Sequence, residues 1–210
     1  ERGLTELGVS VIRAMERIGM IVDVSHVSDQ TFRDIMAIAT RPVIASHSSA
    51  RALSEHPRNM TDDMIRQVGE GGGVVCVNFY SHYVDAEYGE ARRRIRAANS
   101  EHFAEIERTE LGYTEQGPAY RAIAQQLEPG LAVPDIAAIA DHIMHIVAIA
   151  GPQAACLGSD FDGVPELPLG LESVANLPEL SVALQERGMR DEVLRLVLGG
   201  NILRVLGTSD

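Results

Sequence analysis

The sequence lacks several features that mark whole classes of proteins. It has no tryptophan, and its 18 basic residues, all of them arginines, are outnumbered by 30 acidic residues, which gives a formal net charge of -12. Such a surface is repelled by phosphate backbones and anionic membranes, so we expect no nucleic-acid partner. No apolar run reaches the roughly 18 residues of a membrane-spanning helix, and the first residues do not follow a signal-peptide pattern. We therefore expect a chain without a membrane segment.

Cysteine is also scarce. Cys76 and Cys156 stand 80 residues apart, each inside an apolar run. Two such residues cannot build a disulfide-rich scaffold or a four-thiolate zinc site, and we predict two buried thiols. Apolar residues, in contrast, make up 45% of the 210 positions, which is enough to form the core of one domain.

Four apolar segments predict parallel strands, at residues 20–24, 42–46, 74–79 and 154–158. Helical periodicity covers residues 4–18, with Thr5 as the cap and Gly19 as the stop, and residues 135–149. Near-continuous apolar strands that alternate with helices are typical of an α/β fold. No glycine-rich phosphate-binding motif follows any strand, so half of a barrel fits better than a nucleotide-binding sheet.

Residues 84–131 interrupt this alternation with a stretch of mixed charge. The stretch is too long for a simple loop, and we expect a helical insertion between the third and fourth strands of a single domain that spans residues 1–210. The basic run at residues 92–96 could bind an anion, but the neighbouring acids favour a solvated helix face.

His26 and His47 each follow a strand and each stand after a serine. Neutral imidazoles at neighbouring strand ends can converge on one ion, and this donor type suits zinc. The alternative is that each histidine caps a helix or packs in the core. His142 and His145, three apart on a later helix, have no carboxylate between them, and we assign them core or surface roles.

Other candidate groups also stand at strand ends. Asp160 and Asp162 close the fourth strand, where a carboxylate can bind a metal or transfer a proton, or can form a tight acidic turn. Arg58 offers a planar fork suited to a substrate carboxylate, although an exposed surface arginine is the simpler interpretation. Tyr83 lines a pocket or merely packs.

Five motifs together resemble the renal or membrane dipeptidases, zinc metallopeptidase family M19, and they occur at residues 19–28, 42–50, 56–60, 77–80 and 158–163. The resemblance implies a (β/α)8 barrel with two zinc ions that hydrolyses dipeptides through a metal-activated water. It implies that His26 and His47 bind one zinc, that Arg58 holds the terminal carboxylate, that Tyr83 borders the substrate and that Asp160 transfers a proton.

The chain departs from the family pattern in what it lacks. The other metal ligands, a His-x-Asp pair and a bridging glutamate, are expected upstream of residue 1, and a closed barrel needs about eight strands and typically about 250 residues. We therefore expect the C-terminal half of a zinc dipeptidase, acting on a dipeptide and associating with a missing N-terminal half or with a second copy. A non-catalytic half-barrel that serves in binding or assembly, or another zinc-dependent amidohydrolase, stays open as an alternative.

Overall fold

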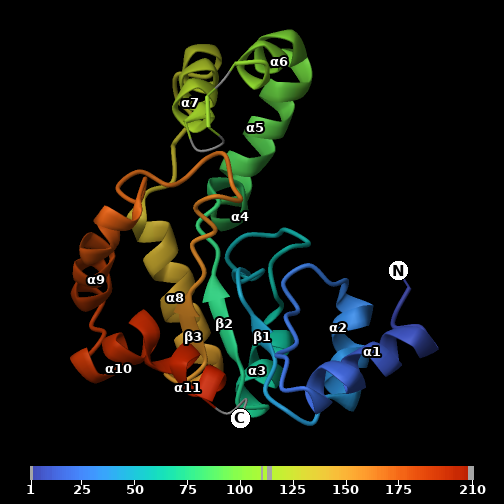
Figure 1. The fold of residues 1–210 in the computed structure, drawn as a ribbon. Helices are drawn as coiled ribbons and strands as arrows, with labels where there is room; N and C mark the ends of the chain where they lie inside the picture. The colour runs from blue at the N-terminus through green and yellow to red at the C-terminus, as the bar shows by residue number, and fades with distance from the viewer. Residues whose placement is uncertain (1, 110, 113–114, 208–210) are drawn as a thin grey trace.

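The computed structural model describes residues 2–109, 111–112 and 115–207, and it contains one parallel sheet with helices around it (Figure 1). The strands are hydrogen-bonded in chain order: β1 (Ile44–Ala45), β2 (Val74–Val77) and β3 (Ala155–Leu157). The strand predicted at residues 20–24 contributes a parallel bridge between Asp23 and Ile44 instead of a longer ladder. The α/β class predicted from the sequence is confirmed.

The helices fill the connections between these strands and continue after the last one. They are α1 (Glu6–Arg17), α2 (Asp29–Ile38), α3 (Asp62–Glu70), α4 (Ser81–Val84), α5 (Ala86–Ala98), α6 (Ser100–Glu107), α7 (Gln116–Leu127), α8 (Ile136–Ala150), α9 (Leu177–Glu186), α10 (Asp191–Arg195) and α11 (Asn201–Gly207). A 3-10 turn, η1 (Val174–Asn176), and a π-helical turn, η2 (Leu196–Gly200), precede α9 and α11. None of the helices in the described ranges is long and apolar enough to cross a bilayer.

Side-chain caps explain where several helices begin. Thr5, Ser28 and Thr61 each accept a hydrogen bond from a backbone N–H three residues further along, at the starts of α1, α2 and α3. The side chains of Asp85 and Asp135 likewise accept a hydrogen bond from a backbone N–H at the starts of α5 and α8. A capping oxygen satisfies a backbone donor that the first helical turn leaves without a partner. The predicted start at Thr5 and the predicted helix from Asp135 are confirmed.

The two faces of the sheet are covered by different helices. Val75, Val77 and Ala155 belong to the main apolar core, which includes the buried faces of α3 and α8. Val74 lies on the other face, in a smaller cluster that includes Val205 of α11. Covering both faces explains why the strands are apolar without interruption.

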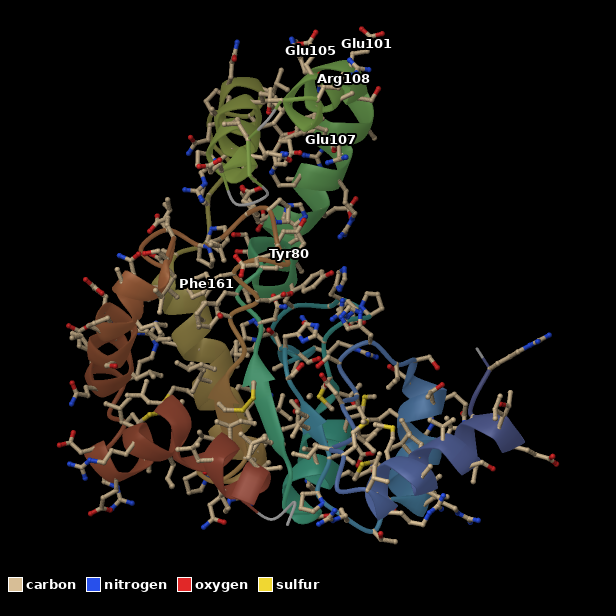
Figure 2. The ribbon with its side chains drawn as sticks, viewed as in Figure 1. Tyr80, Glu101, Glu105, Glu107, Arg108 and Phe161 are labelled. Carbon is tan, nitrogen blue, oxygen red and sulfur yellow. A yellow bond between two sulfur atoms is a disulfide. The ribbon has the colours of Figure 1, made fainter. Side chains whose placement is uncertain are left out.

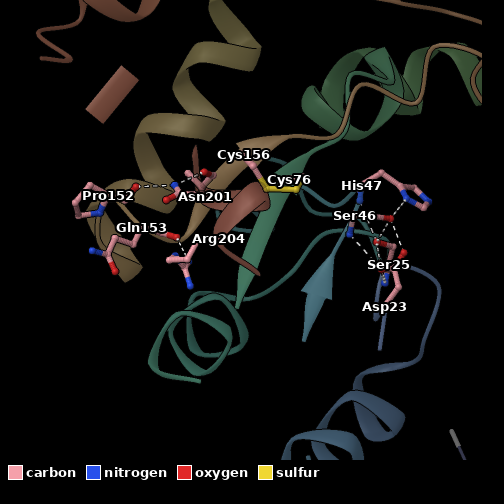
Figure 3. Close-up of a disulfide and its surroundings, with 11 residues drawn as sticks. Asp23, Ser25, Ser46, His47, Cys76, Pro152, Gln153, Cys156, Asn201 and Arg204 are labelled. Atoms are coloured by element: carbon pink, nitrogen blue, oxygen red, sulfur yellow. Dashed lines mark hydrogen bonds between the residues drawn. A yellow bond between two sulfur atoms is a disulfide. The ribbon is translucent and has the colours of Figure 1, made fainter. Parts of the chain in front are cut away.

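Cys76 and Cys156 correct one prediction. Their burial is confirmed, but the structure joins them in a disulfide between β2 and β3, so the prediction of two thiols is wrong (Figure 3). The two residues are direct partners in the parallel ladder, with their Cα atoms 4.1 Å apart. A separation of 80 residues in sequence does not reveal this register.

Helices α5, α6 and α7 project away from the sheet (Figure 1). Their inner sides form a small apolar cluster around Ile95, Phe103 and Tyr120. Glu101, Glu105 and Arg108 lie at the far tip of this projection, whereas Tyr80 and Phe161 lie near its base (Figure 2).

The base of this projection also corrects a prediction. Arg92, expected on a solvated helix face, is 3% exposed and donates two hydrogen bonds to Glu166, which is 1% exposed. Tyr88 also donates to Glu166. Arg93, Arg94 and Arg96 are exposed as predicted. Buried charges require such pairing, and the partner here comes from the loop after β3.

Candidate active site at the strand ends

His26 and His47 meet at the carboxyl end of the sheet. Their Nε2 atoms are 2.7 Å apart, and their ring centroids are 4.8 Å apart. Each ring follows a strand segment, one after the bridge at Asp23 and one after β1. The two histidines that the sequence proposed as a pair therefore lie in direct contact.

Gly158 allows the strands to come together at this edge. A Cβ atom there would lie 2.1 Å from the carbonyl oxygen of Ser46 and 2.8 Å from that of Cys76. No side chain fits at such distances, so only glycine permits this approach of β3 to the loop that carries His47.

A network based on Asp23 holds the loop that carries His47 (Figure 3). Asp23 accepts from the backbone N–H groups of Ser25 and Ser46, at 3.0 and 3.1 Å, and from both serine hydroxyls. Ser25 Oγ in turn accepts from the backbone N–H of His47 at 3.0 Å. The repeated serine before each histidine is visible in the sequence, whereas no sequence pattern marks Asp23 for this role.

This network determines the tautomer of His47. The Ser46 hydroxyl donates to Asp23, so its oxygen is available to accept from Nδ1–H of His47, 2.6 Å away. The Nε2 atom of a neutral His47 then keeps its lone pair, and this lone pair faces His26. An oriented, unprotonated imidazole nitrogen is the form that binds a metal ion.

The charge states of these groups agree with this arrangement. Burial lowers the pKa of His47, Arg58 and His26 add to the effect, and Asp160 and Asp23 offset part of it. Burial alone would raise the pKa of Asp23, but the hydrogen bonds from Ser46 and Ser25 outweigh it and hold that pKa below its usual value. His47 is therefore a neutral imidazole, and Asp23, which supports it through Ser25 and Ser46, is an ionised carboxylate.

Arg58 lies beside the two histidines. Its Nε donates to the carbonyl oxygen of Ser25 at 3.0 Å, and one terminal nitrogen is 3.3 Å from Nε2 of His26. The guanidinium carbon is 5.5 Å from the ring centroid of Tyr83. Arg58 and Tyr83, chosen separately from the sequence, therefore belong to one cluster with the histidines.

Tyr83 is held from several sides. Its ring packs against His56 at 4.4 Å and against Tyr80 at 4.8 Å, measured between centroids. Its carbonyl oxygen accepts from Nδ2 of Asn59, a buried residue that the sequence analysis did not single out. His56 also accepts from the backbone N–H of Arg58, and burial lowers its pKa to about 4, so it is neutral at pH 7.

Asp160 closes the site at the end of β3. Its backbone carbonyl belongs to a turn in which Gly163 N–H donates to the Asp160 carbonyl oxygen at 3.0 Å, and Asp162 is exposed beside it. Asn78 donates to Oδ2 of Asp160 at 3.0 Å. Asp160 thus forms the tight turn that the motif allowed, and its charge raises the pKa of His47, while its role in metal binding or proton transfer stays a prediction.

His142 and His145 lie outside this cluster. His142 is buried; its Nδ1 accepts from the backbone N–H of Ala50 and its Nε2 donates to the carbonyl oxygen of Val84. His145 is 2.7 Å from a carboxylate oxygen of Asp62. Within the described ranges, no three or more His, Cys, Asp or Glu residues gather as ligands of one ion.

Fold and site together define an α/β protein whose polar cluster stands at the carboxyl ends of parallel strands, the edge at which such folds bind ligands. The chain belongs to the membrane dipeptidase family, peptidase family M19, whose model matches residues 1–210.

Two curated relatives come from the fission yeast Schizosaccharomyces pombe, and both are named as uncharacterized dipeptidases. One is 36% identical over 98% of this chain and the other 33% identical over 100% of it. The chain spans 39% and 41% of their lengths. This protein therefore corresponds to about two fifths of the curated relatives that it matches.

Solved structures share the fold. A probable dipeptidase, PvdM, from Pseudomonas aeruginosa has a TM-score of 0.78 at 23% identity, covering 99% of this chain and 55% of its own. A metallo peptidase from Rhodobacter sphaeroides, solved with a phosphinate mimic of the dipeptide L-Ala-D-Ala, has a TM-score of 0.72 at 25% identity, covering 100% of this chain and 48% of its own.

Proposed function

We propose that this chain carries part of the active site of a zinc-dependent dipeptidase. The observation that supports the proposal most directly is the contact of Arg58 with His26, whose ring faces His47, because it combines a metal-binding donor set with a carboxylate-binding fork. Membership of the dipeptidase family and the dipeptide mimic bound by a structural relative point to the same chemistry.

The metal donors fit one half of such a site. His26 and His47 offer two imidazole nitrogens, and a catalytic zinc ion usually has three protein ligands. When bound, zinc lowers the pKa of a coordinated water and polarises the scissile carbonyl group. The remaining ligands of a two-zinc site would come from residues outside this chain.

The other residues would bind the substrate and move the proton. Arg58 would pair with the terminal carboxylate of a dipeptide, with Tyr83 bordering the bound substrate. Asp160 would accept a proton from the attacking water and deliver it to the nitrogen of the leaving amine.

The architecture proposed for the complete site is a (β/α)8 barrel, of which residues 1–210 form the C-terminal part and residues 84–131 a helical insertion. Three paired strands and the bridge at Asp23 leave two sheet edges in the described chain. The share of about two fifths to one half of the relatives' lengths agrees with this proposal.

Metal stripping tests this function. We expect a chelator-treated sample to regain hydrolysis of Gly-D-Ala on addition of Zn²⁺ when the upstream half is supplied, and to show little turnover alone. His47→Ala should abolish the recovery, whereas His145→Ala, a histidine outside the cluster, should not. Equal turnover of the dipeptide and its C-terminal amide would contradict the role of Arg58 and favour another amidohydrolase activity.

A second proposal, assembly with a further chain, is favoured by apolar side chains exposed near the ends of the chain. Leu7 and Ile18 on and after α1 are each 73% exposed, and Leu203 on α11 is 67% exposed. The occupant that we propose is an N-terminal half of the same barrel, and a second copy of this chain is the other outcome of the test. Light scattering after size exclusion decides between them, and a stable monomer that exposes no apolar surface would contradict both.

A further inference from the structure

Asn78 is fully buried directly after β2 and has no role in the function proposed above. Its backbone carbonyl accepts from the hydroxyl of Ser49 at 3.2 Å. Its side-chain Oδ1 accepts from the backbone N–H of Tyr80 at 2.6 Å, and its Nδ2 donates to Oδ2 of Asp160 at 3.0 Å. The amide therefore connects the ends of β2 and β3.

The orientation of this amide follows from its partners. The backbone N–H of Tyr80 is a donor and must face the oxygen of the Asn78 side chain. The nitrogen consequently faces Asp160, and it offers that carboxylate a donor and no acceptor.

The backbone of Asp160 has an uncommon conformation, and its side chain occupies space that only a glycine at position 163 leaves open. Its φ angle is +60°, in the left-handed region that aspartate tolerates better than most residues. A Cβ atom at Gly163 would lie 2.0 Å from Oδ1 of Asp160, so glycine at this position leaves the space that Oδ1 needs. Strained backbone of this kind is maintained only where its surroundings over-determine it.

We propose that Asn78 is a positioning residue for Asp160. Its amide holds Oδ2, so the transferred proton is carried on Oδ1, the oxygen that lies next to Gly163. This inference rests on the proposed dipeptidase function. In that reaction an O–H bond forms at Oδ1 as the attacking water loses a proton. It breaks again as the N–H bond of the leaving amine forms.

Two variants separate positioning from simple structural support. Asn78→Asp keeps the shape and the acceptor for Tyr80 N–H but replaces the donor with an oxygen that faces Asp160. Asn78→Ala removes both interactions. With Zn²⁺ and the upstream half supplied, we expect each to lower kcat by about 10- to 100-fold with KM changed less than about threefold, and Asn78→Asp to be at least as slow as Asn78→Ala.

A purely structural role predicts lower stability in both variants but an unchanged kcat for the folded fraction, because the buried aspartate facing Asp160 and the lost contacts in alanine would act on folding alone. Asn201→Ala serves as the control. Asn201 is equally buried, and it binds the carbonyl oxygens of Pro152 and Ala155 at the other end of β3. It should lose stability but keep kcat. Unchanged kcat in Asn78→Asp would overturn the proposal.

A second measurement does not depend on catalysis. In NMR spectra of the metal-free chain, we expect the side-chain amide protons of Asn78 to exchange slowly with water. We also expect them to shift when Asp160 is replaced by alanine. If the wild-type chain hydrolyses no dipeptide even with Zn²⁺ and the upstream half supplied, the proposed function fails while this measurement still tests the contact. An amide signal that Asp160→Ala leaves unchanged would overturn the inference whatever the activity.

Discussion

Two polar clusters stand above the sheet, and they are built from different chemistry. In the strand-end cluster, Asp23 is satisfied by serine hydroxyls and backbone N–H groups, and the imidazole nitrogens of His26 and His47 face each other at the surface of the site. In the second cluster, Glu166 is paired directly with Arg92 and receives a bond from Tyr88.

The difference lies in what each cluster leaves available. The charges of Glu166 and Arg92 offset each other inside a water-excluded space, so their contribution is to fix the projecting helices to the loop after β3. In the strand-end cluster the hydrogen bonds of Ser46 instead orient the ring of His47, with its Nε2 facing His26. A polar cluster near a strand end is therefore a candidate binding site only where its internal hydrogen bonds leave donor or acceptor atoms available to a ligand.

The largest expected effect concerns the second cluster. Glu166→Gln leaves the buried guanidinium of Arg92 without its counter-charge, and we expect a loss of about 3–5 kcal/mol of unfolding free energy, measured with urea. Glu128→Gln breaks an exposed pair with Arg94 and should change little. Equal losses in the two variants would mean that burial does not distinguish these pairs.

A smaller effect is expected from His142, which joins the loop at Ala50 to the end of α4 at Val84. Burial lowers its pKa to about 4, below the ordinary 6.5. Between these values the unfolded chain binds a proton that the folded chain does not. Stability should therefore fall as the pH drops from about 6.5 to 4, by up to about 3 kcal/mol.

The variant His142→Gln isolates this contribution from those of His56 and His82, whose pKa values are also lowered by burial. We expect it to be less stable at pH 7 and to lose less on acidification than the wild type. Urea titrations at several pH values measure both. An unchanged pH dependence in the variant would show that other groups cause the acid sensitivity.

The smallest effect concerns metal affinity. Asp23→Asn changes one acceptor oxygen of the strand-end cluster into a donor. The Ser46 hydroxyl, which orients the ring of His47, then loses an acceptor for its own hydrogen bond. We expect zinc to bind about 10- to 100-fold more weakly, as measured by competition with a chelator.

The matched control is Asp62→Asn, which alters another carboxylate beside a histidine, His145, outside the cluster. Zinc affinity should not change in this variant. If both variants weaken binding equally, the loss would come from reduced net negative charge rather than from the orientation of His47.

Local patterns predicted the helices and the strand ends well. The cap at Thr5 and the helix after Asp135 depend on neighbours in sequence, and both are found. The pairing of His26 with His47 followed from two equivalent strand ends that meet at one sheet edge.

What the sequence could not reveal depends on distant contacts. Arg92 is buried because Glu166, 74 residues further on, pairs with it. The segment at residue 23 has strand-forming residues, yet its ladder with β1 is reduced to one bridge. The role inferred for Asn78 requires the register that places β2 beside β3.

The disulfide between Cys76 and Cys156 encloses the whole projection of α5, α6 and α7 in one covalent loop. A protease cut at the tip of that projection would leave two fragments that still migrate together until a reductant separates them. Closing a loop of this length also lowers the conformational entropy of the unfolded chain, which stabilises the folded state by about 4–5 kcal/mol on a chain-entropy estimate. The projection can thus be nicked while the strands that carry Asn78 and Asp160 stay joined beneath it.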